Sequence, residues 1–295
     1  MTAALLLLPD FVLIAFGALL RRTRQFDARF WAGVERLVYL VLFPSLLFRS
    51  LATSTASPSE AWRLIAVGVL VTLSGMVLSA LGKPLLRLEP DSFASCFQCA
   101  FRFNTYVALA AAARIGGPQA VALISLLIGI LVPIVNVAAV AMLAHRSDGR
   151  LIFALARNPL VIACVLGIAW NLAGLPLLAP VDRVLELLAT AALPLGLLAV
   201  GAGLAFERGT LPWTAVAWFN GIKLAALPAI AWLASRAIGL DPLGQQVAIT
   251  MAAVPTATSA YILAVQMKAR GAPVALLIST GTLMAALTLP LWLSL

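Results

Sequence analysis

The chain is poor in the side chains that most enzymes use for chemistry. Its 295 residues include one histidine, three cysteines and 11 acidic residues. A metalloprotease needs two histidines and a glutamate, and an acid-dependent lipid transferase needs clustered carboxylates; neither set is present. Cys96, Cys99 and Cys164 lie in apolar segments far from His145, so no zinc-ligand spacing occurs. We therefore predict no enzyme, no metal site and no cofactor.

Charge is scarce as well. Charged residues make up 11% of the chain and hydrophobic residues 63%, with a mean hydropathy of +1.05. Soluble domains have about 25% charged and about 45–50% apolar residues. This composition predicts an all-α polytopic protein whose surroundings are a lipid bilayer. The net charge of +9 is scattered over short loops, which argues against a nucleic-acid partner. Leu5–Leu20 lacks a basic leader and ends at Arg21-Arg22, so we interpret it as a retained span.

Apolar runs between polar breaks predict ten membrane spans. Twelve basic residues fall in one set of alternating loops and five in the other, so the richer side is predicted to be cytoplasmic and both termini outside. Arg36 at a span entrance, Arg102 and Lys223 stand apart from both sets. The expected spans are 4–20, 34–51, 61–82, 92–113, 118–144, 155–175, 181–205, 211–237, 243–267 and 272–294.

An internal repeat divides the chain into two halves. Pro9 and Gly17 are matched by Pro159 and Gly167 at an offset of 150 residues, and Pro44 and Pro194 have the same offset. The expected domains are residues 1–145, a short cytoplasmic linker at 146–157, and residues 158–295. Because five spans are an odd number, the second half enters the membrane from the opposite side, which predicts inverted repeats.

Two spans are interrupted at corresponding places. Pro255 removes a helix donor in span nine, and Thr256, Thr258 and Ser259 offer hydroxyls to the freed backbone groups. In span four, Asn104 and Thr105 compete with the backbone for hydrogen bonds. If both helices break and cross, two helix N-termini direct positive potential into one cavity and attract anions. Paired interruptions of this kind point to a transporter's binding site.

Arg102 gives this site a predicted charge. A guanidinium inside a span normally faces a partner or a watery cavity, and its fork suits a carboxylate. Asp10 is an alternative partner for the guanidinium. A second alternative is that Arg102 lies closer to the membrane interface and extends its charged end into it. Lys223 and Asp10 are candidates for a coupling role, whereas Ser45 beside Pro44 could reach the cavity from the opposing domain. Tyr106 and Tyr261 are candidate ligands that packing would explain equally well.

Four segments together resemble the auxin efflux carrier family, the bacterial relatives of the plant auxin exporters. They are Leu42–Phe48, Arg102–Tyr106, Asn158–Leu160 and Val254–Tyr261. The resemblance implies a sodium/bile-acid-symporter-like or sodium/proton-antiporter-like fold with crossed spans four and nine. It further implies a scaffold of spans one, two, six and seven, a transport domain of the other spans, and a homodimer through the scaffold. It implies organic anions as substrates and location in the bacterial inner membrane; bacterial relatives are often described as malonate or malate carriers.

The leading hypothesis is an elevator-type secondary transporter, in particular an efflux carrier, of small carboxylates such as malonate, malate or auxin-like acids. Arg102, Asn104, Thr105, Tyr106, Pro255, Thr256, Thr258, Ser259, Tyr261 and Ser45 form the candidate substrate site. A cation- or proton-coupled transporter of related fold is the alternative, but it needs an intramembrane acid, and we see none beyond Asp10. A membrane ligand sensor without transport is a further alternative.

Overall fold

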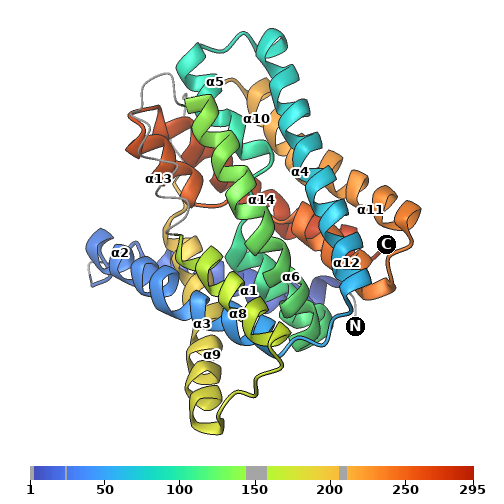
Figure 1. Ribbon diagram of the computed structural model, residues 1–295. Helices are drawn as coiled ribbons and strands as arrows, with labels where there is room; N and C mark the ends of the chain where they lie inside the picture. Colours follow the sequence, from blue (N-terminus) through green and yellow to red (C-terminus); the bar gives the residue numbers. More distant parts are fainter. Residues whose placement is uncertain (1–2, 24, 144–157, 206–210) are drawn as a thin grey trace.

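The computed structural model describes residues 3–23, 25–143, 158–205 and 211–295 (Figure 1). Within these ranges all regular structure is helical. The predicted cytoplasmic linker at 146–157, with His145 before it, lies outside the described residues.

The described helices fall close to the expected spans. Their bounds are α1 Ala3–Leu20, α2 Ala28–Leu37, η1 Val38–Leu42, α3 Phe43–Ala52, α4 Pro58–Leu86, α5 Pro90–Phe97, η2 Gln98–Ala100, α6 Thr105–Leu143, α8 Pro159–Leu172, α9 Ala179–Ala202, α10 Trp213–Gly221, η4 Ile222–Ala226, α11 Leu227–Ile238, α12 Pro242–Ala253, α13 Ser259–Gln266 and α14 Gly271–Leu293.

Among the described residues, six helical stretches are long and apolar enough to cross a membrane, and two apolar helices, Leu5–Leu20 and Pro159–Leu172, are shorter. The chain is therefore an all-helical integral membrane protein. The number of ten crossings stays a prediction.

Polar residues followed by proline begin several helices. Ser57 precedes α4 and Asn158 precedes α8, and each accepts a backbone N–H of the first turn through its side-chain oxygen. Asp241 does the same for two N–H groups of α12. Proline follows at the first helical position in all three cases, where its missing N–H costs nothing. Local sequence thus sets where these helices start.

Gly117 separates the two spans that share the long helix α6. Its φ of 54° and ψ of −143° interrupt the helical backbone, a conformation that glycine adopts without steric cost. Pro118 then starts the second segment of α6, in which it supplies the fixed φ of a helix beginning. The expected division between spans four and five near residue 115 is present at this kink.

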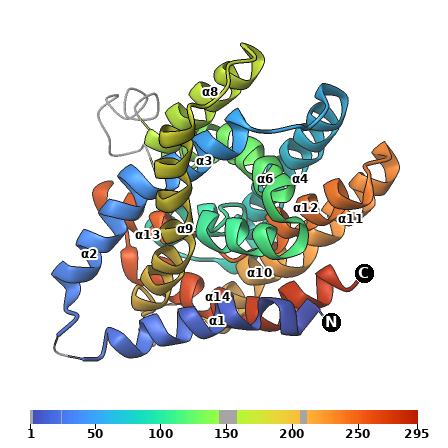
Figure 2. The same cartoon turned by 90° about the horizontal axis from the view of Figure 1, so that it is seen from below.

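Two groups of helices pack mainly among themselves. Helices α1, α2, α3, α8 and α9 form one group, in the lower part of Figure 1. Helices α4, α10, α11, α12 and α14 form the other, at the top and right. Helix α6 contacts both groups. The two chain ends lie close together in both views (Figures 1 and 2).

Candidate functional site

The two interruptions expected from the sequence lie against each other. Residues 101–104 between η2 and α6 are non-helical, and so are residues 254–257 before α13. The backbone N–H of Asn104 donates to the carbonyl of Pro255 at 2.8 Å. The hydroxyl of Thr256 donates to the carbonyl of Cys99 at 2.6 Å. Each break therefore supplies hydrogen bonds that the other needs, which non-helical backbone requires within a membrane.

Asn104 is the N-cap of α6. Its Oδ1 accepts the backbone N–H groups of Tyr106 and Val107 at 3.0 and 3.3 Å. Its other polar atom, Nδ2, is buried without a hydrogen-bond partner. A buried donor without an acceptor costs about 1–3 kcal/mol. The amide therefore has one unused donor group that an acceptor on a ligand could satisfy.

Arg102 is buried among neutral hydrogen-bond acceptors. Its guanidinium donates to Gln98 Oε1 at 2.9 Å, to Asn136 Oδ1 at 2.7 Å and to Ser259 Oγ at 3.3 Å. These partners come from η2, the second part of α6, and α13, so the side chain joins three elements at the crossing. No ion pair of Arg102 with a carboxylate occurs among the described residues. The charge is solvated by dipoles but not neutralised.

The alternative pairing of Arg102 with Asp10 is wrong. Asp10 on α1 accepts a hydrogen bond from Arg114 of α6 at 3.3 Å. Arg114 lies three turns beyond the break, so Asp10 is engaged at a different level of the protein. The second carboxylate oxygen of Asp10, Oδ2, is buried without a partner.

The start of α13 is the open side of the crossing. Thr258 at the N-cap makes no side-chain capping hydrogen bond to the helix. Ser259 is exposed although its hydroxyl binds Arg102. The backbone N–H groups of Ala260 and Tyr261 donate to the carbonyls of Ala257 and Thr258, each at 3.0 Å. What this helix end offers an anion is therefore its partial positive charge.

The remaining predicted site residues make their contacts in several different places. Thr105 is the first residue of α6 and half-buried. Tyr106 stacks on Phe43 of α3 with ring centroids 4.6 Å apart. Ser45 of α3 donates its hydroxyl to the carbonyl of Val41 in η1, one turn earlier. Tyr261 is 42% exposed, and its ring lies beside Gly271 at the start of α14, so we find no contact that brings it to Arg102 or Asn104.

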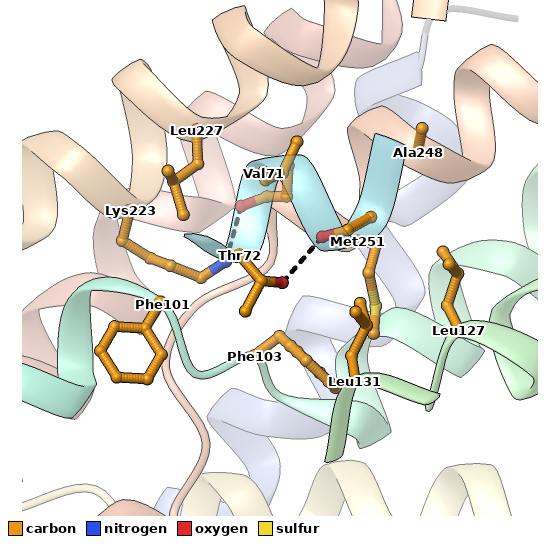
Figure 3. Close-up of a pocket in the computed structure, with 12 residues that line it drawn as sticks. Val71, Thr72, Phe101, Phe103, Leu127, Leu131, Lys223, Leu227, Ala248 and Met251 are labelled. Atoms are coloured by element: carbon orange, nitrogen blue, oxygen red, sulfur yellow. Dashed lines mark hydrogen bonds between the residues drawn. The ribbon is translucent and has the colours of Figure 1, made fainter. Parts of the chain in front are cut away.

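Lys223 lies on η4, and its side chain reaches the C-terminal end of α12, the half-helix that precedes Pro255. Its Nζ donates to the carbonyl of Ala252 at 2.6 Å, a bond drawn dashed in Figure 3. A cation at a helix C-terminus is favourable because the last carbonyls carry partial negative charge. The side chain borders a cavity of about 20 Å³, between Phe101 and Leu227 (Figure 3), which has room for about one water molecule. Among the residues that the structure describes, no group of side chains could hold a metal ion.

Sequence reasoning missed two polar residues of the crossing. Gln98 precedes Arg102 by four residues, a spacing that brings two side chains together on one face of a helix. Asn136 is the lone amide in an apolar run.

The sequence was then compared with known proteins. A family model described as membrane transport protein, the family of the auxin efflux carriers, matches residues 143–293. The chain belongs to this family. The resemblance noted in the sequence is thereby confirmed. No curated protein matches the sequence.

For a membrane transport protein, the crossing has a definite chemical character. Arg102 contributes an unneutralised positive charge, Asn104 an unused N–H donor, and the N-terminus of α13 a partial positive charge. All three favour a ligand that carries negative charge and accepts hydrogen bonds. The matched region includes Pro255–Ser259 and Lys223, whereas Arg102 and Asn104 lie before it.

Proposed function

We propose that the chain is a secondary transporter of small organic carboxylates, with its anion site at the crossing of η2–α6 and α12–α13. The observation that carries this proposal is that Arg102, although buried, bonds only to neutral oxygens. A carboxylate beside it would complete the charge balance. The Nδ2 of Asn104 supports the same ligand class, because it needs an acceptor.

The proposed architecture has ten spans in two inverted five-span repeats, residues 1–145 and 158–295. Spans one, two, six and seven would form the scaffold, and the others the moving transport domain. The separate packing of the two helix groups supports this division. The proximity of the chain ends is compatible with an even number of crossings. We further propose a homodimer through the scaffold, in a bacterial inner membrane with both termini outside.

A metal-cation carrier is less well supported by the same geometry. The carbonyl end of α12 is where a bound cation would be favourable, and the Lys223 amine already donates to Ala252 there. The positive charge at this end of α12 is therefore supplied by the side chain of Lys223. We therefore propose carriage of an anion rather than of a metal cation.

Uptake into proteoliposomes tests the proposal. Radiolabelled malonate, malate, acetate and indole-3-acetate are each offered to vesicles with wild-type protein, with Arg102→Ala, or without protein. We expect saturable accumulation or exchange of at least one carboxylate by the wild type and its loss in Arg102→Ala. Saturable binding without accumulation would indicate a ligand sensor, and unchanged transport by well-inserted Arg102→Ala would remove the anion anchor from the proposal.

A further inference from the structure

The break at Pro255 leaves carbonyl groups of the last turn of α12 without their usual helical partners. Helix α12 ends at Ala253, and residues 254–257 are non-helical. In a continuous helix the N–H of residue 255 would bond the carbonyl of Met251, but proline has no N–H. The carbonyl of Ala252 would bond residue 256, which already lies outside the helix. The end of α12 therefore presents carbonyl oxygens and a partial negative charge among buried residues.

The amine of Lys223 occupies this helix end. Its Nζ donates to the carbonyl of Ala252 at 2.6 Å, and the residue is 2% exposed. Thr72 of α4 lines the same small cavity (Figure 3). The Thr72 hydroxyl donates its one hydrogen to the carbonyl of Gly68 at 2.8 Å, so its oxygen can only accept further bonds. An ammonium group donates and never accepts, so it suits a place that offers carbonyl and hydroxyl oxygens. Oxygens of this kind also bind small hard cations.

Acidic residues are scarce around this amine. In the described part of the chain, η4 contacts α4, α10, α11, α12, α14 and η2. The one acidic residue in these elements is Glu60, in the first turn of α4 and about three turns before Thr72. The ion pairs found among the described residues do not include Lys223. The carbonyl end of α12 is therefore the group that compensates the buried charge.

The amine is also separate from the proposed anion site. Phe101 and Phe103 line the cavity beside Lys223. Arg102, between them in the sequence, bonds instead to its three neutral partners from η2, α6 and α13. Successive side chains of an extended segment point to opposite faces, which explains this division. Lys223 is therefore not a second arm of the anion site, and its charge acts at the end of α12.

We propose that the C-terminal end of α12 is a binding site for one monovalent cation, and that the ammonium group of Lys223 fills this site in place of a free ion. The amine supplies the positive charge and the N–H donors that the carbonyl oxygens require, and its side chain tethers it there. Removing the side chain opens the site to a small free cation, in particular a primary ammonium ion of matching length. A second consequence, which rests on the proposed function, is that carboxylate uptake requires neither Na⁺ nor K⁺.

Chemical rescue of Lys223→Ala tests the site without knowledge of the substrate. Propylammonium has the carbons and the amine that the substitution removes, and propan-1-ol keeps its shape and a hydrogen-bond donor without the charge. Each is titrated into purified protein while thermal unfolding is followed. We expect propylammonium, but not propan-1-ol, to raise the melting temperature of Lys223→Ala by about 2 °C or more. The wild type and Lys83→Ala, which removes an exposed lysine, should show no such rise. An equal effect of the two compounds, or no effect of either, overturns the proposal.

Lys223→Met controls for the place of binding. Its unbranched apolar side chain refills the space without a charge, so propylammonium should leave its melting temperature unchanged. A rise as large as that of Lys223→Ala would mean that propylammonium binds elsewhere, against the proposal. If Lys223→Ala is lost during purification, membranes are extracted in propylammonium or in propan-1-ol, and the yield of folded protein becomes the measurement. A higher yield in propylammonium supports the cation site, and equal yields overturn it.

Uptake by wild-type proteoliposomes separates this inference from the transport function. Carboxylate uptake is measured in Na⁺, K⁺ or N-methyl-D-glucamine buffers of equal ionic strength, and we expect equal rates. Rescue of Lys223→Ala together with no carboxylate uptake by any vesicle supports the cation site and rejects the transporter of small carboxylates. Carboxylate uptake without rescue of Lys223→Ala supports the transporter and rejects the cation site. Uptake that requires Na⁺ or K⁺ also overturns the inference, because a free cation would then be needed.

Discussion

Replacing Asn136 by aspartate tests whether the charge of Arg102 recruits the substrate. Asn136 Oδ1 accepts the guanidinium N–H at 2.7 Å, and aspartate keeps an acceptor oxygen in the same place. The substitution adds a negative charge without removing a hydrogen bond. Arg102 would then have a counter-ion inside the protein, and a substrate carboxylate would find a neutral pair instead of a free cation.

The size of the effect follows from Coulomb's law. Two unit charges about 4 Å apart attract by about 4 kcal/mol at an effective dielectric constant of about 20. Even if half of this is lost to screening and rearrangement, about 2 kcal/mol remains, which corresponds to roughly 30-fold in Kd. We therefore expect Asn136→Asp to bind malonate at least about 30-fold more weakly than the wild type.

The assay combines a Kd with a melting temperature. Calorimetric titration with malonate, or with whichever carboxylate the uptake screen identifies, gives the affinity, and thermal unfolding reports stability. We expect the melting temperature of Asn136→Asp to be unchanged or higher, because the new charge is paired with good geometry. Gln246→Glu is the matched control, since it makes the same amide-to-acid change at an exposed position of α12. Wild-type affinity in a folded Asn136→Asp would refute the reasoning.

Three further substitutions have expected outcomes. Lys223→Met leaves the carbonyl of Ala252 without its charged donor, so differential scanning fluorimetry should show a melting temperature lowered by a few degrees, for a loss of about 1–3 kcal/mol. Gly201→Ala places a methyl group into the backbone of α1, whereas Gly221→Ala meets open space, so detergent-extracted yield should fall only for the former. Pro255→Ala restores a helix donor at the crossing, so its uptake rate should fall more than its membrane expression.

Contrary results would be equally specific. A melting temperature of Lys223→Met equal to that of the wild type would show that its bond to Ala252 adds no net stability. Equal yields of Gly201→Ala and Gly221→Ala would mean that α1 and α9 separate without cost. Wild-type uptake by Pro255→Ala would make the interruption incidental to transport.

Apolar runs predicted where the helices lie, and signals of a few adjacent residues also set where several of them begin. Ser57, Asn158 and Asp241, each followed by proline, begin helices through their own side chains. The break at Asn104 was likewise visible, since an asparagine oxygen can cap the helix that follows it. Such signals need no knowledge of distant segments.

Contacts between distant segments could not be predicted in the same way. Arg102 was recognised as a buried charge, but its partners Asn136 and Ser259 are 34 and 157 residues away in sequence. Asp10 was an alternative partner for Arg102 but binds Arg114, because sequence shows the sign of a charge and not its depth.

Two contacts of α6 with the group of α1, α2, α3, α8 and α9 bear on how the protein could move. Asp10 of α1 binds Arg114, and Tyr106 stacks on Phe43 of α3. An elevator movement of the crossing against α1–α3 must break both contacts. An ion pair and an aromatic pair of these kinds contribute about 1 kcal/mol each, so their loss is small enough for the movement to be reversible.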